Sequence, residues 1–529
     1  MKKYNLVEYN WIPCFDLDDN YKKVNLKDIL VNAHNIESLV CDSGMQKLAI
    51  QQMLGAIIGR IYSEELEEEG QDFWFDLMDE GKFDVDKIVE YLEGQYDNLW
   101  IINDEGIPFM QLASLEDCDN LKPASNFVST MDVSANKDKL YTPAIESLYI
   151  DEAIRWLITF QACSTKSAFQ GGEKNDVPVS QASGRLANTL QMGYKGRNLF
   201  ETILLNLPCR KMDEEVYPRY KSTSWENMEA FKKGVKILEI EKGDLSAIWT
   251  FITKRCRLKF NDDFTQVEGI YVYTKNKNFH TYNQKLDEID PYRVWKKKGS
   301  DFVKNDNGEC MAYKMSASNT SLMTCMESAT SIQPNDPKGK ISYPWWKGSQ
   351  QTADYMMYDY TIEYFLQALD SKGVMFDWST HTSLYIDPRV YDDEQVKGQY
   401  EIIIHRYLKD VLYRCERMLK LVDQTSSDGM YSIVGNRVLS LITGRQMSHE
   451  VVEEVRKFMI KVVHEVKDYT VTKVIEGKFG TTSTLGKETK KNYVKQSITD
   501  LQEMLLNEVI DMERGAYWCL KSQKLQTES

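Results

Sequence analysis

Apolar residues recur at helical spacing in the first part of the chain. They predict one helix from Leu48 to Ile61, a second from about Leu148 to Gln161, and a helical stretch led by Val24–Leu30. The run Gly269–Tyr273 is rich in β-branched and aromatic residues, which favour a strand. Helices, short strands and polar connections therefore alternate up to about residue 390.

The pattern changes after about residue 395, where three long series keep apolar residues three and four positions apart. A shorter helix fits between Met430 and Ile442. The apolar positions of the long series are Tyr407, Leu408, Val411, Leu412, Cys415, Met418, Leu419 and Val422; Val452, Val455, Met459, Val462, Val466 and Tyr469; and Val494, Ile498, Leu501, Leu505 and Met512. Four amphipathic helices joined by polar links predict a four-helix bundle.

We therefore expect an α+β fold with two domains, a mixed N-terminal domain at residues 1–390 and the bundle at residues 391–529. A chain of 529 residues exceeds one ordinary core. Its ten cysteines are scattered without a C-x-x-C pair, which is typical of a reducing compartment. The sequence shows neither a signal peptide nor an apolar run of membrane-spanning length, so we expect a cytoplasmic protein without a membrane partner.

The net charge of −15 is unevenly distributed. Residues 191–300 hold 21 Lys and Arg against 15 Asp and Glu, a net charge of +6 that leaves −21 for the rest of the chain. Aromatic residues such as Tyr271 and Trp295 are interleaved with these basic groups. A basic stripe with aromatic residues is the pattern expected of a phosphate-backbone contact, although a solvated charged surface gives the same pattern.

No catalytic or metal-binding motif is present in the sequence. The six histidines form no H-x-x-x-H pair, and neither a P-loop nor a G-x-S-x-G motif occurs. We therefore expect no catalytic residues, no metal and no cofactor. The carboxylate pairs Asp262–Asp263 and Asp392–Asp393 keep a metal-dependent nuclease open as an alternative, although adjacent acids in loops are usually only solvated.

Two polar segments have both a structural and a functional interpretation. Gly171 and Gly172 follow the helix that ends near Gln161, where glycines usually end a helix or form a turn. Without side chains, they would also let the backbone approach a ligand closely. The segment Trp378–Ser383 is expected to be a turn, either a plain loop or a tip presented to a partner.

The order of several short motifs resembles a known family. Asn10–Pro13, the NLKDIL stretch, Pro108–Gln111 and the helix followed by FQA and Gly-Gly occur as in the CasA family, the large subunit of the type I-E CRISPR surveillance complex Cascade. The resemblance spans the whole chain. It implies a non-catalytic subunit that reads the protospacer-adjacent motif (PAM) in target double-stranded DNA, helps to open the duplex and recruits a helicase–nuclease. Its partners would be the other Cascade subunits with the CRISPR RNA.

The resemblance also implies which residues meet DNA in the minor groove. A glycine loop falls on Ala168–Gly172, with Gly171 best supported, and a groove-reading lysine falls on Lys277, in Lys275–Lys277. A wedge aligns with Ser379–Thr382, where His381 replaces a common glutamine. The implied DNA-binding residues are Ala168, Phe169, Gln170, Gly171, Gly172, Lys275, Lys277, Ser379, Thr380, His381 and Thr382.

Two further implications concern assembly and metal. A loop that anchors the subunit near the guide RNA 5′ end maps to about Asn126–Tyr141. Some relatives carry a cysteine cluster suggestive of zinc, whereas this chain has only Cys256 nearby, so no zinc is expected. Besides the Cascade subunit and the nuclease, a purely structural scaffold remains a third hypothesis.

Overall fold

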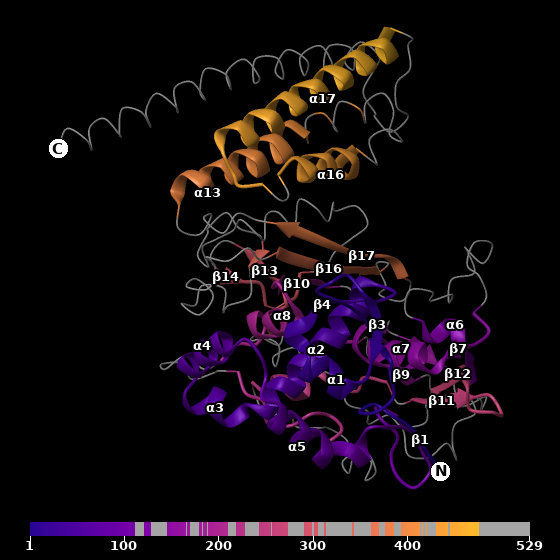
Figure 1. The fold of residues 1–529 in the computed structure, drawn as a ribbon. Coiled ribbons are helices and arrows are strands. Elements are labelled where there is room, and N and C mark those ends of the chain that lie inside the picture. The colour runs from indigo at the N-terminus through magenta and orange to yellow at the C-terminus, as the bar shows by residue number, and fades with distance from the viewer. Residues whose placement is uncertain are drawn as a thin grey trace. The chain divides into compact units, whose positions relative to one another are not determined.

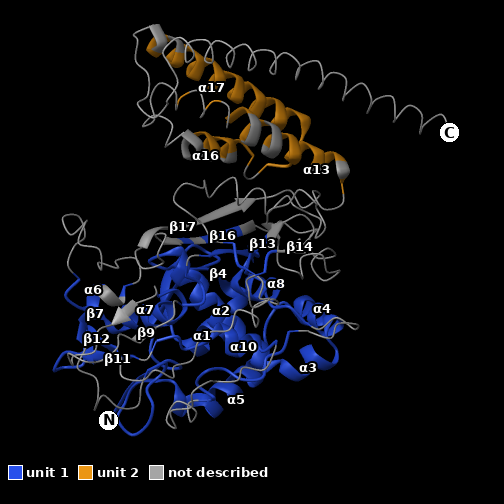
Figure 2. Ribbon diagram, turned by 180° about the vertical axis from the view of Figure 1, so that it is seen from behind, with its two compact units in different colours: residues 1–319, 331–384 blue, residues 320–330, 385–529 orange. Residues whose placement is uncertain are grey.

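A computed structural model describes most of the chain up to residue 475 and divides it into two compact units (Figure 2). Unit 1 contains residues 1–319 and 331–384, and unit 2 contains residues 320–330 and 385–529. The described residues are 1–111, 121–128, 145–164, 167–169, 179–181, 184–187, 189–209, 218–227, 243–254, 256–272, 290–298, 301–304, 311–313, 341–342, 361–369, 376–385, 393–412, 415, 419, 430–442 and 445–475. The boundary at residue 390 stays a prediction.

Helix α2 (Gly44–Ile61) is the central element of unit 1 (Figure 1). Ser43 caps its first turn by accepting a hydrogen bond from the Gln46 amide. Nearly every residue of the helix is buried, since helices α7 (Ile150–Cys163) and α10 (Leu245–Trp249) both pack on it. Gly55 and Gly59 lie one turn apart, and their missing side chains leave room for Trp249 and Tyr220.

Shorter helices complete unit 1. Of these, α1 and α5 pack on each other, as do α3 and α4, and both α5 and α8 contact α2. Their bounds are α1 (Leu26–Val31), α3 (Ser63–Glu68), α4 (Gln71–Glu80), α5 (Val85–Gln95), α6 (Ala124–Phe127) and α8 (Leu199–Leu205).

The described strands of unit 1 form small sheets, in which β1–β5, β10–β16, β11–β12 and β2–β3 pair antiparallel. Three-stranded sheets have the orders β3-β2-β4, β10-β16-β17 and β14-β13-β15, and β11-β12-β6 is joined by β7, which also pairs with β12. Two-stranded pairs are β1-β5 and β8-β9. The strands are β1 (Lys2–Asn5), β2 (Ile12–Asp16), β3 (Tyr21–Val24), β4 (Ile36–Leu39), β5 (Trp100–Asn103), β6 (Leu121–Pro123), β7 (Leu148–Tyr149), β8 (Ser167–Phe169), β9 (Val179–Gln181), β10 (Leu190–Lys195), β11 (Cys256–Phe260), β12 (Gln266–Val272), β13 (Trp295–Lys298), β14 (Asp301–Phe302), β15 (Ile341–Ser342), β16 (Thr361–Leu369) and β17 (Phe376–Tyr385).

Unit 2 is helical where the structure describes it. Helix α13 (Glu394–Glu401) continues into the π-helical segment η6 (Ile402–Val411), and α16 (Met430–Ile442) and α17 (His449–Ile475) follow. Helix α17 packs on both η6 and α16 (Figure 1). The buried positions are those that the apolar periodicity predicts, among them Tyr407, Leu408, Val411, Val452, Val455 and Met459. The fourth predicted helix, near residues 494–512, lies outside the described residues, so the bundle itself stays a prediction.

The α+β class is confirmed by the mixture of helices and strands, and the predicted helices and strand in unit 1 correspond to α1, α2, α7 and β12. The expected turn at Trp378–Ser383 is wrong, because these residues lie in the middle of β17. Apolar or β-branched residues at every second position, from Phe376 through Thr380 to Leu384, carry the period of a strand.

Candidate nucleic-acid interface

The residues predicted to meet DNA are only partly within the described structure. Ala168 and Phe169 lie in β8, and Ser379, Thr380, His381 and Thr382 lie in β17. Gln170, Gly171, Gly172, Lys275 and Lys277 lie outside the described residues, as does the predicted anchoring loop beyond Val128 up to Tyr141. The described residues that flank these segments show how they are attached to the rest of unit 1.

The chain that carries Gly171 leaves and returns at the C-terminal end of α7. Strands β8 and β9 pair antiparallel, with Ser167 opposite Gln181 and Phe169 opposite Val179. After β9, the Gly184 amide donates to the Ser164 carbonyl oxygen at 2.7 Å, and the Leu186 amide donates to the Ala162 carbonyl oxygen at 2.7 Å. These bonds use carbonyl groups at the helix end, which have no partner within the helix itself. The β8–β9 pair is thus fixed to α7 at its base.

The chain that carries Lys277 is described again from Asp290, which is completely buried. The Arg185 guanidinium donates from Nη1 to Asp290 Oδ2 at 2.9 Å, and the two side chains are 2% and 0% exposed. Asp290 Oδ1 accepts hydrogen bonds from the Tyr292 amide at 3.1 Å and from Trp249 Nε1 at 3.3 Å. A second arm of Arg185, Nη2, donates to the Gln52 side chain of α2. The ends of the two chain segments therefore meet in one buried ion pair.

The backbone after Asp290 continues along β10. The Met192 amide donates to the Tyr292 carbonyl oxygen at 2.7 Å, and Gln191 and Arg293 form a bridge. The Arg293 guanidinium donates from Nη2 to the carbonyl oxygen of Arg185 at 2.6 Å. Burial raises the pKa of the Tyr292 hydroxyl well above its ordinary value, so this phenol stays neutral.

The strand that carries the predicted wedge belongs to the same framework. β17 pairs with β16, which pairs with β10 in a register that places Leu190 opposite Leu366. From β16, Gln367 Nε2 donates to the Cys163 carbonyl oxygen at 3.2 Å, at the end of α7. Glu363 of β16 accepts from Lys47 of α2 at 2.6 Å, and both side chains are buried. The described residues that flank or carry the three predicted DNA-binding segments are therefore attached to α7, β10 and α2.

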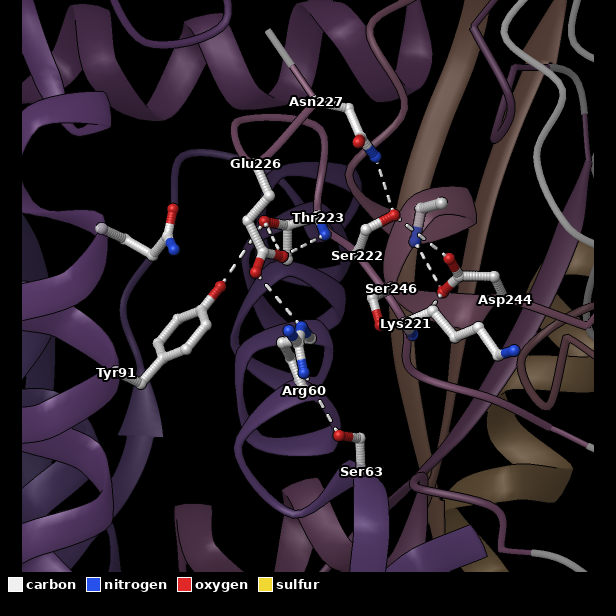
Figure 3. Close-up of polar contacts among 12 residues, drawn as sticks. Arg60, Ser63, Tyr91, Lys221, Ser222, Thr223, Glu226, Asn227, Asp244 and Ser246 are labelled. Carbon is white, nitrogen blue, oxygen red and sulfur yellow. Dashed lines mark hydrogen bonds and ion pairs between the residues drawn. The ribbon is translucent and has the colours of Figure 1, made fainter.

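A polar cluster shown in Figure 3 fixes α10, the helix that carries Trp249. Asp244 is the N-cap of this helix and accepts from the Ala247 amide at 3.3 Å and the Lys221 amide at 3.1 Å. The Ser222 hydroxyl donates to Asp244 at 3.4 Å and accepts from the Asn227 side chain at 2.7 Å. Burial raises the pKa of Asp244, against the opposing effect of these hydrogen bonds.

The other half of Figure 3 connects the same loop to α2. Glu226 accepts from the Thr223 amide at 2.6 Å and from Arg60 Nε of α2 at 3.1 Å. The Tyr91 hydroxyl lies 3.5 Å from the Thr223 hydroxyl, and burial raises the pKa of Tyr91 well above its ordinary value. These contacts are structural, since Thr223 and Glu226 have the spacing of a capping box. They hold α10, and with it Trp249, in place.

The basic stripe predicted at residues 191–300 contains both buried and exposed residues in the structure. Lys254 and Arg293 are each 1% exposed, and Trp295 is 2% exposed. The Arg293 guanidinium lies 5.6 Å from the centre of the Trp295 ring, a cation–π distance. The prediction that these three residues face a phosphate backbone is wrong, because they are core residues; Lys296, in contrast, is exposed.

Clusters of potential metal ligands are absent from the part of the chain that the structure describes. No three His, Cys, Asp or Glu side chains there lie together as a metal site would need. Asp262 and Asp263 lie exposed between β11 and β12, whereas Asp393 caps α13 by accepting from the Gln395 and Val396 amides. Cys256 is buried, 3.4 Å from Gln161 Nε2. No helix among the described residues is long and apolar enough to cross a membrane.

Comparisons with solved structures give fold matches along nearly the full chain. The fold matches Thermus thermophilus CasA (Cse1) with a TM-score of 0.67 and 14% identity, covering 96% of this chain and 100% of that chain. Thermobifida fusca Cse1 matches with a TM-score of 0.67 and 16% identity, covering 96% and 98%. A chain of a structure described as a CRISPR RNA-guided surveillance complex matches with a TM-score of 0.69 and 13% identity, covering 95% and 100%. At these identities the matches show the fold.

Comparisons of the sequence itself give the family. No curated protein sequence matches this chain. The family model for CRISPR-associated protein Cse1 matches residues 5–321, more than half of the chain. This match confirms the resemblance inferred from the ordered motifs. The chain belongs to the CRISPR-associated Cse1 (CasA) family, the family of the large subunit of the type I-E Cascade complex.

Proposed function

We propose that this chain is the non-catalytic large subunit of a cytoplasmic, RNA-guided surveillance complex that reads the PAM of target double-stranded DNA. It binds the other Cascade subunits with their CRISPR RNA, helps to open the duplex and recruits a helicase–nuclease. The DNA-binding residues are those of the Ala168–Gly172 segment, Lys275 with Lys277, and Ser379–Thr382. Target recognition beyond this short motif belongs to base pairing with the guide.

The observation that carries this proposal is the common attachment of the three segments. The base of β8–β9, the Asp290 end of the Lys277 segment and the β10–β16–β17 sheet are joined by hydrogen bonds and one ion pair. Residues that read one short stretch of a groove have to approach it together, which a shared rigid support makes possible. Minor-groove reading by a lysine and by exposed backbone also fits the acceptors displayed there.

The distribution of charge indicates which part of unit 1 faces away from DNA. Residues 63–105, which contain α3, α4 and α5, hold 16 Asp and Glu against 2 Lys and Arg. Such a concentration of negative charge repels the phosphate backbone. We therefore place DNA away from these helices, and substitutions there serve as controls.

The test is capture of a guide-matched duplex by the assembled complex. Lys277→Ala and Gly171→Asp, each in the full complex, are expected to abolish motif-dependent capture without affecting assembly. Lys87→Ala, on α5 and paired with Glu65, is the matched control and is expected to capture normally. Normal capture by both Lys277→Ala and Gly171→Asp would show that these residues do not read the motif.

The same preparation separates this proposal from a nuclease and from a scaffold. A metal-dependent nuclease would cleave DNA as the isolated chain with Mg²⁺ or Mn²⁺, and we expect no cleavage. A pure scaffold would support assembly with equal capture of motif-containing and motif-free targets. We expect capture to depend on the motif, and cleavage to start only when the helicase–nuclease is added.

A further inference from the structure

We propose that Arg185 and Asp290 are positioning residues that hold the two motif-reading segments in one fixed relation to each other. The proposal rests on the proposed function, since it says how the segments with Gly171 and Lys277 reach the same duplex together. Neither side chain is proposed to touch DNA, because both are buried.

The pair joins segments that are far apart in the sequence. Arg185 follows Gly184, which is fixed to the end of α7 just after β9, and Asp290 lies 105 residues further along. The Arg185 guanidinium donates both to Asp290 and to Gln52 of α2. These bonds connect the base of the β8–β9 hairpin to the central helix. The backbone of Arg185 is also held in place, because Arg293 donates to the Arg185 carbonyl oxygen at 2.6 Å.

The carboxylate of Asp290 has a different partner set on each oxygen. Oδ2 accepts from Arg185, while Oδ1 accepts from the Tyr292 amide and from the Trp249 indole. A carboxylate held from both sides has one orientation, and a planar guanidinium with two fixed arms also has one. The contacts therefore define both the distance and the angle between the two segment ends.

A contribution to folding stability does not by itself explain the buried pair of Arg185 and Asp290. Moving two charges out of water costs about as much as their attraction returns, so apolar residues of similar volume often serve stability equally well. The gain that an apolar pair cannot supply is a single, directional arrangement. A binding surface built from two separate segments needs such an arrangement.

The experiment uses Asp290→Asn in the full complex. Asn keeps an oxygen for Trp249 and Tyr292 but turns an amide donor toward Arg185, so the ion pair is lost selectively. Asp151→Asn is the matched control: Asp151 is also buried and accepts from Arg155 at 3.1 Å and Lys23 at 2.6 Å, but lies at the other end of α7. Both variants are compared at temperatures well below their unfolding midpoints.

Two readouts are measured, one without and one with DNA. In hydrogen exchange, Asp290→Asn is expected to increase exchange in peptides covering both 165–183 and 290–295, whereas Asp151→Asn leaves both unchanged. In capture assays, Asp290→Asn is expected to weaken binding of the motif-containing duplex about tenfold, within the range of coupling energies that such residues carry, while binding to a guide-matched single strand is kept. Increased exchange confined to 290–295, or unchanged motif dependence, would overturn the proposal.

A second variant covers the case in which Asp290→Asn fails to assemble. Arg185→Lys keeps the charge beside Asp290 but loses the arm to Gln52, so we expect the same two effects at smaller size. If Lys277→Ala loses capture while Asp290→Asn and Arg185→Lys do not, the motif reading stands and the positioning role falls. If Lys277→Ala and Gly171→Asp both capture normally, these residues do not read the motif, and the exchange result still decides whether the pair couples the two segments.

Discussion

Gly184 lies against the backbone of Ala162 so closely that a side chain has no room. A Cβ atom on Gly184 would lie 2.5 Å from the Ala162 carbonyl oxygen, which is shorter than any real Cβ contact. The neighbouring Cys163 amide nitrogen would lie at 2.7 Å. Because these are backbone atoms at the end of α7, they cannot rotate away. Glycine is what lets the chain returning from β9 cross the helix end and donate to Ser164.

Gly184→Ala is therefore expected to destabilise unit 1 by about 1–3 kcal/mol, the usual cost of overpacking. Gly94→Ala is the control, since nothing lies within 4 Å of its Cβ position on α5, and it is expected to stabilise by about 0.5–1 kcal/mol through helix propensity. Denaturant unfolding of both variants measures the difference. Equal stability of Gly184→Ala and the original chain would mean that the hairpin base moves freely.

Asp244→Ala tests the cluster that supports Trp249. Asp244 is 2% exposed, and its substitution removes the N-cap of α10 and the acceptor of the part-buried Lys221 amide, so we expect a loss of about 2–4 kcal/mol. Asp84→Ala, at the exposed N-cap of α5, removes comparable bonds to the Asp86 and Lys87 amides but leaves them to water. Its expected cost is about 1 kcal/mol. A cost for Asp244→Ala no larger than that for Asp84→Ala would contradict the role assigned to burial.

Asp151 and Asp244 are expected to give opposite dependences of stability on pH. Burial would raise the pKa of Asp151, but hydrogen bonds and charges from Lys23 and Arg155 outweigh it, so that pKa lies below the ordinary 3.8. Its contribution is present above pH 3.8 and is lost as pH falls through the folded-state pKa. The pKa of Asp244 is raised, mainly by burial, so its contribution is present below pH 3.8 and is lost as pH rises through the folded-state pKa.

The measurement compares each Asp→Asn variant with the original chain in urea across this range. The stability advantage of the original chain over Asp151→Asn should shrink as the pH falls below 3.8. Relative to Asp244→Asn, the original chain should lose stability as the pH rises above 3.8. Parallel profiles for the two variants would show that at least one carboxyl group lacks the expected pKa shift.

Much of the fold is predictable from local pattern. Apolar periodicity predicts α2, α7, α16 and α17, because one face or the whole of each helix is buried. One element of the wrong predicted type is β17, where polar residues such as Ser379 and Thr382 suggested a turn although the two-residue period of a strand was present. Pairing with β16, which ends only at Leu369, decided the outcome, because strand formation depends on the tertiary context more than on local propensity.

The candidate site is predictable only as a set of segments. Charge counting placed Lys254 and Arg293 in a DNA-facing stripe, whereas the fold buries both. Nothing local marks Arg185, Asp290 and Gln52 as a connected group, because their contacts span up to 133 positions in the chain. Such long-range contacts are visible only in the folded structure, whereas the composition of each segment predicts no more than its net charge and polarity.

Lys275 and Lys277, two positions apart, are expected to respond differently to substitution if one contacts phosphate and the other contacts base edges. Lys275→Ala should weaken capture of all targets alike and reduce the slope of log affinity against log salt by about one, the effect of losing one phosphate contact. Lys277→Ala should instead reduce discrimination between motif-containing and motif-free duplexes, because groove acceptors are what it reads. Titrations of the assembled complex at several salt concentrations measure both quantities, with Lys87→Ala as the control. If the two variants share one salt slope and one discrimination ratio, both lysines act only through their charge, and motif reading must then come from the backbone around Gly171 and from β17.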